Sequence, residues 1–256
     1  MVSRPAVTAV ECPDAFESST VFPTIVYANS VSRLLLCGLG VVLACLGSPS
    51  AAEAQDKPAD SKPAETDKSA WKPLFDGKTL KDWEITDFGG EGEVVVKDGV
   101  IEMGMGSPLT GITYLGKTPT CDYEVRVEAM RIEGIDFFST VTFPVNDSFC
   151  SLVVGGWAGP VVGISCVDSY DASENETTTY QKLESKKWYR VRIRVRKNRI
   201  QAWIDDKEVV DLETAGRKLS TRAEVSLNEP FGLACYQTRA GIRKIELRKL
   251  PRKSTR

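Results

Sequence analysis

Four carboxylates lie close together in one polar stretch of the chain. Asp168, Asp171, Glu174 and Glu176 fall within nine residues. Clustered carboxylates repel one another unless they bind a hard cation or share protons. The stretch therefore predicts a divalent metal site of the Ca²⁺ type formed by all four, or acid/base catalysis by Asp168, Asp171 and Glu174. A plain solvated acidic loop is the alternative interpretation.

The chain contains no histidine, which narrows its chemistry. Histidine is the commonest general base and a usual zinc ligand, so Ser-His-Asp and Cys-His catalysis and histidine-ligated zinc are excluded. The sequence also lacks a phosphate-binding loop and a dinucleotide-binding glycine pattern, so no nucleotide is expected, and no haem. Carboxylates, Lys, Tyr, Arg and an oxygen-ligated metal remain available.

Two tryptophans stand where a sugar ring could stack. Trp157 lies among small residues in GGWAGP, and Trp203 shares a strand face with Gln201 and Asp205. An aromatic ring flanked by an amide and a carboxylate is typical of sugar recognition. We therefore expect these four residues to bind substrate. The alternatives are that Trp157 folds over the core and that Trp203 packs on a neighbouring strand.

The sharpest local charge is a row of arginines at alternate positions. Arg190, Arg192, Arg194 and Arg196 share one strand face, which could grip a sulfated or uronic polysaccharide. The alternative is a face paired with acidic neighbours on the next strand. Because the whole chain carries 33 basic and 35 acidic residues, its composition gives no reason to expect nucleic acid as a partner.

The first 70 residues differ in composition from the rest. Residues 34–47 form a short apolar run after Arg33, and the A-x-A pattern at residues 52–54 predicts cleavage before Gln55. Residues 1–54 are thus interpreted as an N-terminal extension and signal peptide, which implies export to the periplasm, envelope or medium, with no membrane span after cleavage. A lipoprotein anchored through Cys45 is the less favoured alternative. Residues 55–70 read as a disordered linker and residues 251–256 as a basic tail.

Residues 71–250 read as strands throughout. Tyr123, Val125 and Val127 alternate with charged residues, and the stretch 189–196 repeats the pattern. The run 94–103, with Lys-Asp-Gly at its centre, predicts a hairpin. Many short strands without helices indicate an all-β fold, a jelly-roll sandwich of two antiparallel sheets.

Four cysteines remain in the mature chain, at positions 121, 150, 166 and 235. An exported protein could pair them in three ways. We expect buried thiols instead, because a domain of this size has core enough without disulfides.

Several segments together resemble one known family. LFDGKTLKDW at residues 74–83 resembles the opening LF(D/N)GK-x-L-x-x-W of the 3-keto-disaccharide hydrolase domain family. Support comes from VKDGVI at 96–101, CDYEV at 121–125, WYRVRI at 188–193 and IQAWIDDKEVV at 200–210. The resemblance covers nearly all of residues 71–250. It implies a concanavalin A-like jelly roll that acts on glycosides oxidised at C3.

A 3-keto group acidifies the C2 hydrogen, so the glycosidic bond can leave by elimination, followed by hydration. This chemistry needs a base and an enolate stabiliser but no histidine. One departure bears on activity: members carry a stretch resembling NSGVFFR where residues 134–144 read GIDFFSTVTFP, without the arginine. Three functions therefore stand: a hydrolase or lyase on 3-keto-glycosides, a non-catalytic carbohydrate-binding module, and an envelope interaction protein. The sequence does not define the oligomeric state.

Overall fold

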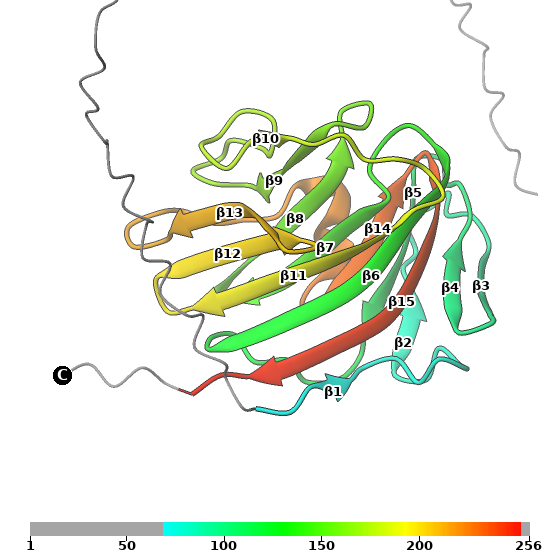
Figure 1. Ribbon diagram of the computed structural model, residues 1–256, viewed down its shortest axis with the longest axis horizontal. Helices are drawn as coiled ribbons and strands as arrows, with labels where there is room; N and C mark the ends of the chain where they lie inside the picture. Colours follow the sequence, from blue (N-terminus) through cyan, green and yellow to red (C-terminus); the bar gives the residue numbers. More distant parts are fainter. Residues whose placement is uncertain (1–68, 252–256) are drawn as a thin grey trace, which may run out of the picture. The chain divides into compact units, whose positions relative to one another are not determined.

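Residues 69–251, the part of the chain that the computed structural model describes, form a sandwich of two antiparallel sheets (Figure 1). The eight-stranded sheet runs β13-β12-β11-β6-β15-β4-β3, with β1 beside β15. The seven-stranded sheet runs β10-β9-β8-β7-β14-β5-β2. The predicted all-β jelly-roll sandwich is thereby confirmed. The predicted signal peptide, Cys45, and most of the linker and of the basic tail lie outside the described residues.

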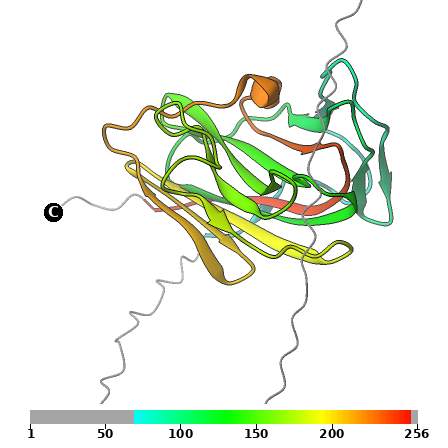
Figure 2. The same ribbon diagram turned by 90° about the horizontal axis from the view of Figure 1, so that it is seen from above.

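The strands of the eight-stranded sheet are β1 (Lys72–Pro73), β3 (Val94–Lys97), β4 (Val100–Met103), β6 (Tyr123–Gly134), β11 (Trp188–Arg196), β12 (Arg199–Ile204), β13 (Lys207–Glu213) and β15 (Thr238–Lys249). Those of the seven-stranded sheet are β2 (Trp83–Ile85), β5 (Leu109–Tyr114), β7 (Ser139–Val145), β8 (Ser148–Gly156), β9 (Val161–Ser165), β10 (Thr179–Tyr180) and β14 (Gly232–Tyr236). Between β13 and β14 lies a 3₁₀ helix, η1 (Ala223–Asn228). In Figure 2, η1 lies on the side of the seven-stranded sheet away from the yellow strands of the other sheet. Within the described residues, no helix is long and apolar enough to cross a membrane.

Alternation along each strand builds the core between the sheets. Tyr123, Val125 and Val127 of β6 are buried in one cluster with Val191 and Ile193 of β11, and the intervening residues face outward. The predicted hairpin is formed by β3 and β4, whose connecting Asp98 and Gly99 both have positive φ. Two successive residues with positive φ match the right-handed twist of the strands in a two-residue hairpin, so the Asp-Gly pair correctly predicts this turn.

The four described cysteines are free thiols, as expected from the sequence. Cys150, Cys166 and Cys235 are buried, and Cys121 is half-buried. Burial raises the pKa of the Cys235 thiol to about 12, so this thiol is not a nucleophile at neutral pH.

The outer face of the eight-stranded sheet is organised around one buried carboxylate. Glu124 of β6 is fully buried and binds Arg192 at 3.2 Å, Arg194 at 2.6 Å and Arg248 at 2.5 Å. Burial disfavours the charged form, but the hydrogen bonds and charges of Arg194 and Arg248 outweigh it and lower the pKa of Glu124. The arginine row is therefore a face paired with acidic neighbours, which is the alternative interpretation given above.

Replacing Glu124 by Gln should lower the free energy of unfolding by about 3 kcal/mol, the scale for breaking a buried ion pair. The replacement leaves three arginines facing one another without a counter-charge. Because the folded-state pKa of Glu124 is depressed, the loss is expected in full above the ordinary pKa of glutamate and should fade as the pH falls through the folded-state value.

The measurement is urea unfolding, monitored by circular dichroism at several pH values between pH 7 and pH 3. Asp211→Asn is the matched control, because Asp211 pairs with Arg199 on an exposed part of the same sheet. The control should cost about 1 kcal/mol or less. Equal losses in the two variants would contradict the assigned role of Glu124.

Candidate functional site

Small hydroxyl side chains line the outer face of the seven-stranded sheet. In β7, Val141 points into the core, so Thr140 and Thr142 point outward. Ser151 of β8 lies opposite Thr142 on one side and Ser165 of β9 on the other. These hydroxyl residues are buried although they face away from the other sheet, so loops must cover them.

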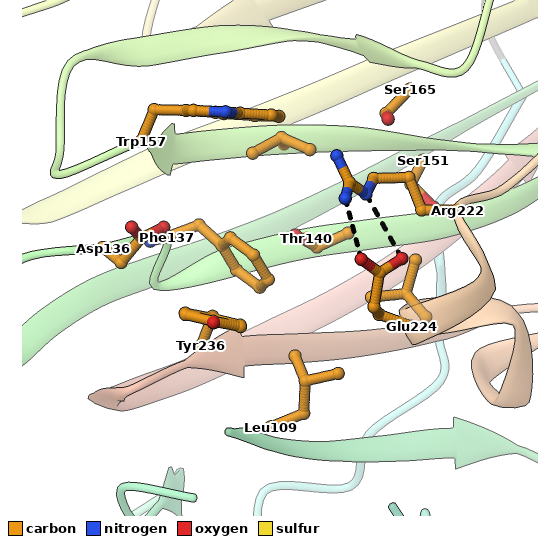
Figure 3. A pocket seen from close by; sticks show the side chains of 12 residues that line it. Leu109, Asp136, Phe137, Thr140, Ser151, Trp157, Ser165, Arg222, Glu224 and Tyr236 are labelled. Carbon is orange, nitrogen blue, oxygen red and sulfur yellow. Dashed lines mark hydrogen bonds and ion pairs between the residues drawn. The ribbon is translucent and has the colours of Figure 1, made fainter. Parts of the chain in front are cut away.

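A cavity of about 270 Å³ lies over this face, between the sheet and the loops that cover it (Figure 3). Thr140, Ser151 and Ser165 contribute its polar lining. Its apolar walls come from several elements: Leu109, Phe137, Val153, Val225 and Tyr236. Its charged residues are Asp136, Arg222 and Glu224, and Trp157 stands at one end. An apolar pocket with a few convergent polar groups is the usual form of a small-molecule site.

Trp157 is held at the cavity by an unusual turn between β8 and β9. Trp157 and Ala158 both have positive φ, a region that non-glycine residues rarely adopt. Asp136 fixes this turn, because one carboxylate oxygen accepts the Ala158 N–H at 3.0 Å. Arg131 supports it from behind by donating to the Gly155 carbonyl at 3.3 Å. The indole remains 39% exposed, so it is not folded over the core, and its role in stacking on a sugar stays a prediction.

The cavity lining also carries an ion pair, whose Arg222 guanidinium lies 5.9 Å from the Trp157 ring centroid. Arg222 donates to both carboxylate oxygens of Glu224, at 2.7 and 3.3 Å, and to Asp171 at 2.7 Å. The hydrogen bond from Arg222 is the largest cause of a lowered pKa at Glu224, which is therefore ionised at neutral pH. A guanidinium and a carboxylate thus lie side by side on the lining.

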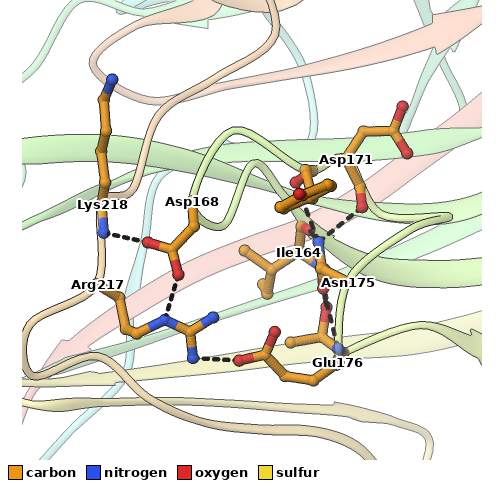
Figure 4. Close-up of polar contacts among 9 residues, drawn as sticks. Ile164, Asp168, Asp171, Asn175, Glu176, Arg217 and Lys218 are labelled. Atoms are coloured by element: carbon orange, nitrogen blue, oxygen red, sulfur yellow. Dashed lines mark hydrogen bonds and ion pairs between the residues drawn. The ribbon is translucent and has the colours of Figure 1, made fainter.

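Three carboxylates of the predicted acidic site form ion pairs with two arginines (Figure 4). Arg217 binds Asp168 at 2.6 Å and also pairs with Glu176, while Arg222 binds Asp171. Backbone hydrogen bonding from Lys218, followed by Arg217, lowers the pKa of Asp168. Within residues 69–251, no three His, Cys, Asp or Glu side chains are grouped to hold a metal ion. The calcium site stays a prediction, but the geometry favours arginine as the counter-charge.

The catalytic candidates from the sequence are not brought to the cavity together. Asp171 lies behind Arg222 and can orient it, whereas Asp168 is bound to Arg217 and Glu174 is exposed on the loop. None of the three is among the residues that line the cavity.

Gln201, Trp203 and Asp205 belong to the other sheet and do not line the cavity. Trp203 is only 9% exposed because the Arg192 guanidinium lies 3.7 Å from its ring centroid. Gln201 donates to Glu208 at 3.1 Å, and Asp205 accepts the Arg190 N–H at 3.0 Å. This geometry favours the packing interpretation of Trp203 over sugar contact.

Sequence reasoning missed Asp136, Thr140, Arg222, Glu224 and Tyr236 as cavity residues. A weak signal existed for Arg222, because it and Arg217 are the only arginines between residues 200 and 238 and follow the acidic stretch by some fifty positions. Thr140 and Thr142 also alternate with apolar residues, as expected for a strand with one polar face.

Residues 70–248 match the model of the 3-keto-alpha-glucoside-1,2-lyase-like domain, so the chain belongs to this family. The resemblance found in the sequence is thereby confirmed. No curated protein is detectably similar to the chain in sequence.

Among solved structures, a protein of unknown function with a galectin-like fold from Bacillus subtilis is similar, with a TM-score of 0.51 at 10% identity. The match covers 72% of this chain and 96% of that one. The carbohydrate-binding module CBM66 from Bacillus subtilis matches with a TM-score of 0.43 at 10% identity, over 66% of this chain and 96% of that one. The Crh5 transglycosylase matches with a TM-score of 0.48 at 13% identity, over 71% of this chain and 84% of that one. At these identities the likeness concerns the fold alone.

Replacing Arg217 by Gln should loosen the segment that follows it, because two carboxylates lose their partner. We expect backbone amides near Lys218 to exchange hydrogen about fivefold faster, the effect of losing roughly 1 kcal/mol of local ion pairing. Hydrogen exchange with mass spectrometry measures this peptide by peptide. Arg239→Gln, which removes the ion pair with Glu102 in the other sheet, is the control and should leave this segment unchanged.

Calcium distinguishes a cation site from an arginine-paired loop. If Arg217 and Arg222 supply the counter-charge, millimolar calcium should leave the melting temperature of the wild type unchanged. A rise of several degrees that Asp171→Asn abolishes would instead support the cation site predicted from the sequence.

Proposed function

We propose that this protein is an exported enzyme that binds 3-keto-glycosides in the cavity and cleaves them by elimination and hydration. The observation that carries the proposal is the meeting of Trp157, Glu224 and Arg222 around one cavity in a chain of the lyase-like family. An aromatic face supports a sugar ring, and the charged pair can serve proton transfer and oxyanion stabilisation. Export rests on the leader pattern in residues 1–54.

In the proposed reaction, a Glu224 oxygen takes the C2 proton of the 3-keto sugar. The electrons of the C2–H bond form an enolate, whose negative charge develops on the C3 oxygen and is stabilised by an N–H of Arg222. The enolate then reforms the ketone as the C1–O bond breaks, and the leaving alcohol takes the proton from Glu224, which returns to its carboxylate form. Water adds across the resulting C1–C2 double bond to complete hydrolysis.

Glu224 suits the role of base better than Asp136. Both oxygens of Asp136 accept backbone N–H groups, from Phe137 at 2.7 Å and Ala158 at 3.0 Å, and these bonds hold the turn. Each oxygen of Glu224 accepts from Arg222 but has a second lone pair for the substrate proton. Asp171 contributes indirectly as a positioning residue for Arg222.

One observation favours a non-catalytic carbohydrate-binding module as the second candidate. Pairing with Arg222 lowers the pKa of Glu224, and a weaker base abstracts a carbon-bound proton more slowly. In that case the cavity and Trp157 would serve binding alone.

The test is incubation of the purified protein with 3-keto-disaccharides and their unoxidised parents, with and without chelator. Glu224→Gln should lower the rate at least about a hundredfold, the scale for a lost general base. Trp157→Ala should chiefly raise KM, because it removes a binding surface. Glu208→Gln, on an exposed part of the other sheet, is the control and should leave both constants unchanged. Glycan binding without turnover of any keto or parent glycoside would establish the binding module instead.

A further inference from the structure

Thr140 presents a buried hydroxyl that has no hydrogen-bond partner among the described residues. The residue is 1% exposed and lines the cavity, and its Oγ1 accepts from and donates to nothing in this part of the chain. A buried polar group without a partner costs about 1–3 kcal/mol. Valine would fill the same space without this cost, so the hydroxyl calls for a partner inside the cavity.

The neighbouring hydroxyls differ from Thr140 in this respect. Ser151 Oγ lies 2.9 Å from Thr142 Oγ1, a good mutual hydrogen bond. Ser165 Oγ lies 3.5 Å from Cys166 Sγ, a weak contact with sulfur. Of these three hydroxyls on the polar lining, only that of Thr140 has no partner among the described residues.

The charges around the cavity oppose an anionic ligand. Asp136 and Glu224 are on the lining and Asp171 adjoins it, against one guanidinium on the lining, Arg222, and one behind the Trp157 turn, Arg131. Arg222 already binds Glu224 with two N–H groups and Asp171 with a third. A uronate, sulfate or phosphate would meet a surplus of carboxylate, since like charges at close range raise the free energy of the bound state.

We propose that Thr140 is a specificity-determining residue whose hydroxyl binds a hydroxyl or carbonyl oxygen of an uncharged sugar. The proposal rests on carbohydrate binding in the proposed function and goes further, because it names the contact and excludes acidic sugars. A site that hydrogen-bonds a substrate hydroxyl rejects analogues that lack it, since its own polar group is then left unpaired.

The chain offers a matched control for this proposal. Thr238, at the start of β15, is also fully buried and its Oγ1 also has no partner in the described residues, but it does not line the cavity. Thr140→Val and Thr238→Val therefore remove the same kind of group at similar burial. Both variants should keep the melting temperature of the wild type to within a few degrees or raise it slightly.

The experiment measures binding of methyl α-glucoside, its 3-keto form, its monodeoxy analogues and methyl α-glucuronoside by calorimetry. Thr140→Val should weaken binding of the two parent sugars about tenfold, whereas Thr238→Val and Thr140→Ser should bind as the wild type does. One deoxy analogue should bind wild type and Thr140→Val equally, which identifies the ligand atom. The glucuronoside should bind at least about tenfold more weakly than the glucoside.

The outcomes separate this proposal from the proposed function. If the wild type binds the sugars and Trp157→Ala weakens binding, but Thr140→Val matches Thr238→Val, then the role of Thr140 is wrong and the site stands. Tight binding of the glucuronoside overturns the exclusion of acidic sugars. A wild type that binds none of the neutral sugars overturns both proposals.

Discussion

The candidate site depends on two arginines that join an acidic loop to the segment preceding β14. Arg217 binds Asp168 and Glu176, and Arg222 binds Asp171 and Glu224. Each exposed ion pair contributes little on its own, but the four share two guanidinium groups that are thereby fixed. They help to hold the segment with η1 over the hydroxyl-lined face of the seven-stranded sheet, and without it the cavity would lack the wall that bears Glu224 and Val225.

Arginine–carboxylate ion pairs occur on the outer faces of both sheets, but they cover one face and leave a cavity over the other. On the eight-stranded sheet, Glu124 gathers arginines from two neighbouring strands, and Arg192 covers the Trp203 ring, so the face is closed. On the seven-stranded sheet, the covering arginine comes from a loop that stands away from the strands, so a hollow remains beneath it. This difference explains why one exposed tryptophan, Trp157, faces a cavity while Trp203 is shielded by guanidinium groups.

The sequence predicted the fold well and the site only in part. Apolar alternation is local, so β6, β11 and the β3–β4 hairpin could be read directly from their residues. Trp157 stood out because a turn rich in glycine marked it. The acidic loop was also found, but its partners lie 49 and 51 positions away in the chain, and pairing at that distance has no periodic signal. Likewise, the shielding of Trp203 depends on strand register, since Arg192 lies opposite Trp203 across β11 and β12.

The pairing of Glu224 with Arg222 affects the basicity of Glu224 differently before and after the substrate of the proposed reaction binds. In the free protein the guanidinium lowers the pKa of Glu224, which weakens it as a base. A bound 3-keto oxygen that accepts from Arg222 competes with Glu224 for the same positive charge, and closure of the cavity by the sugar also removes water from the carboxylate. Both changes raise the pKa of Glu224 and strengthen it as a base. The substrate itself would thus activate the carboxylate that attacks it, while Asp171 keeps the guanidinium in place as Glu224 becomes protonated.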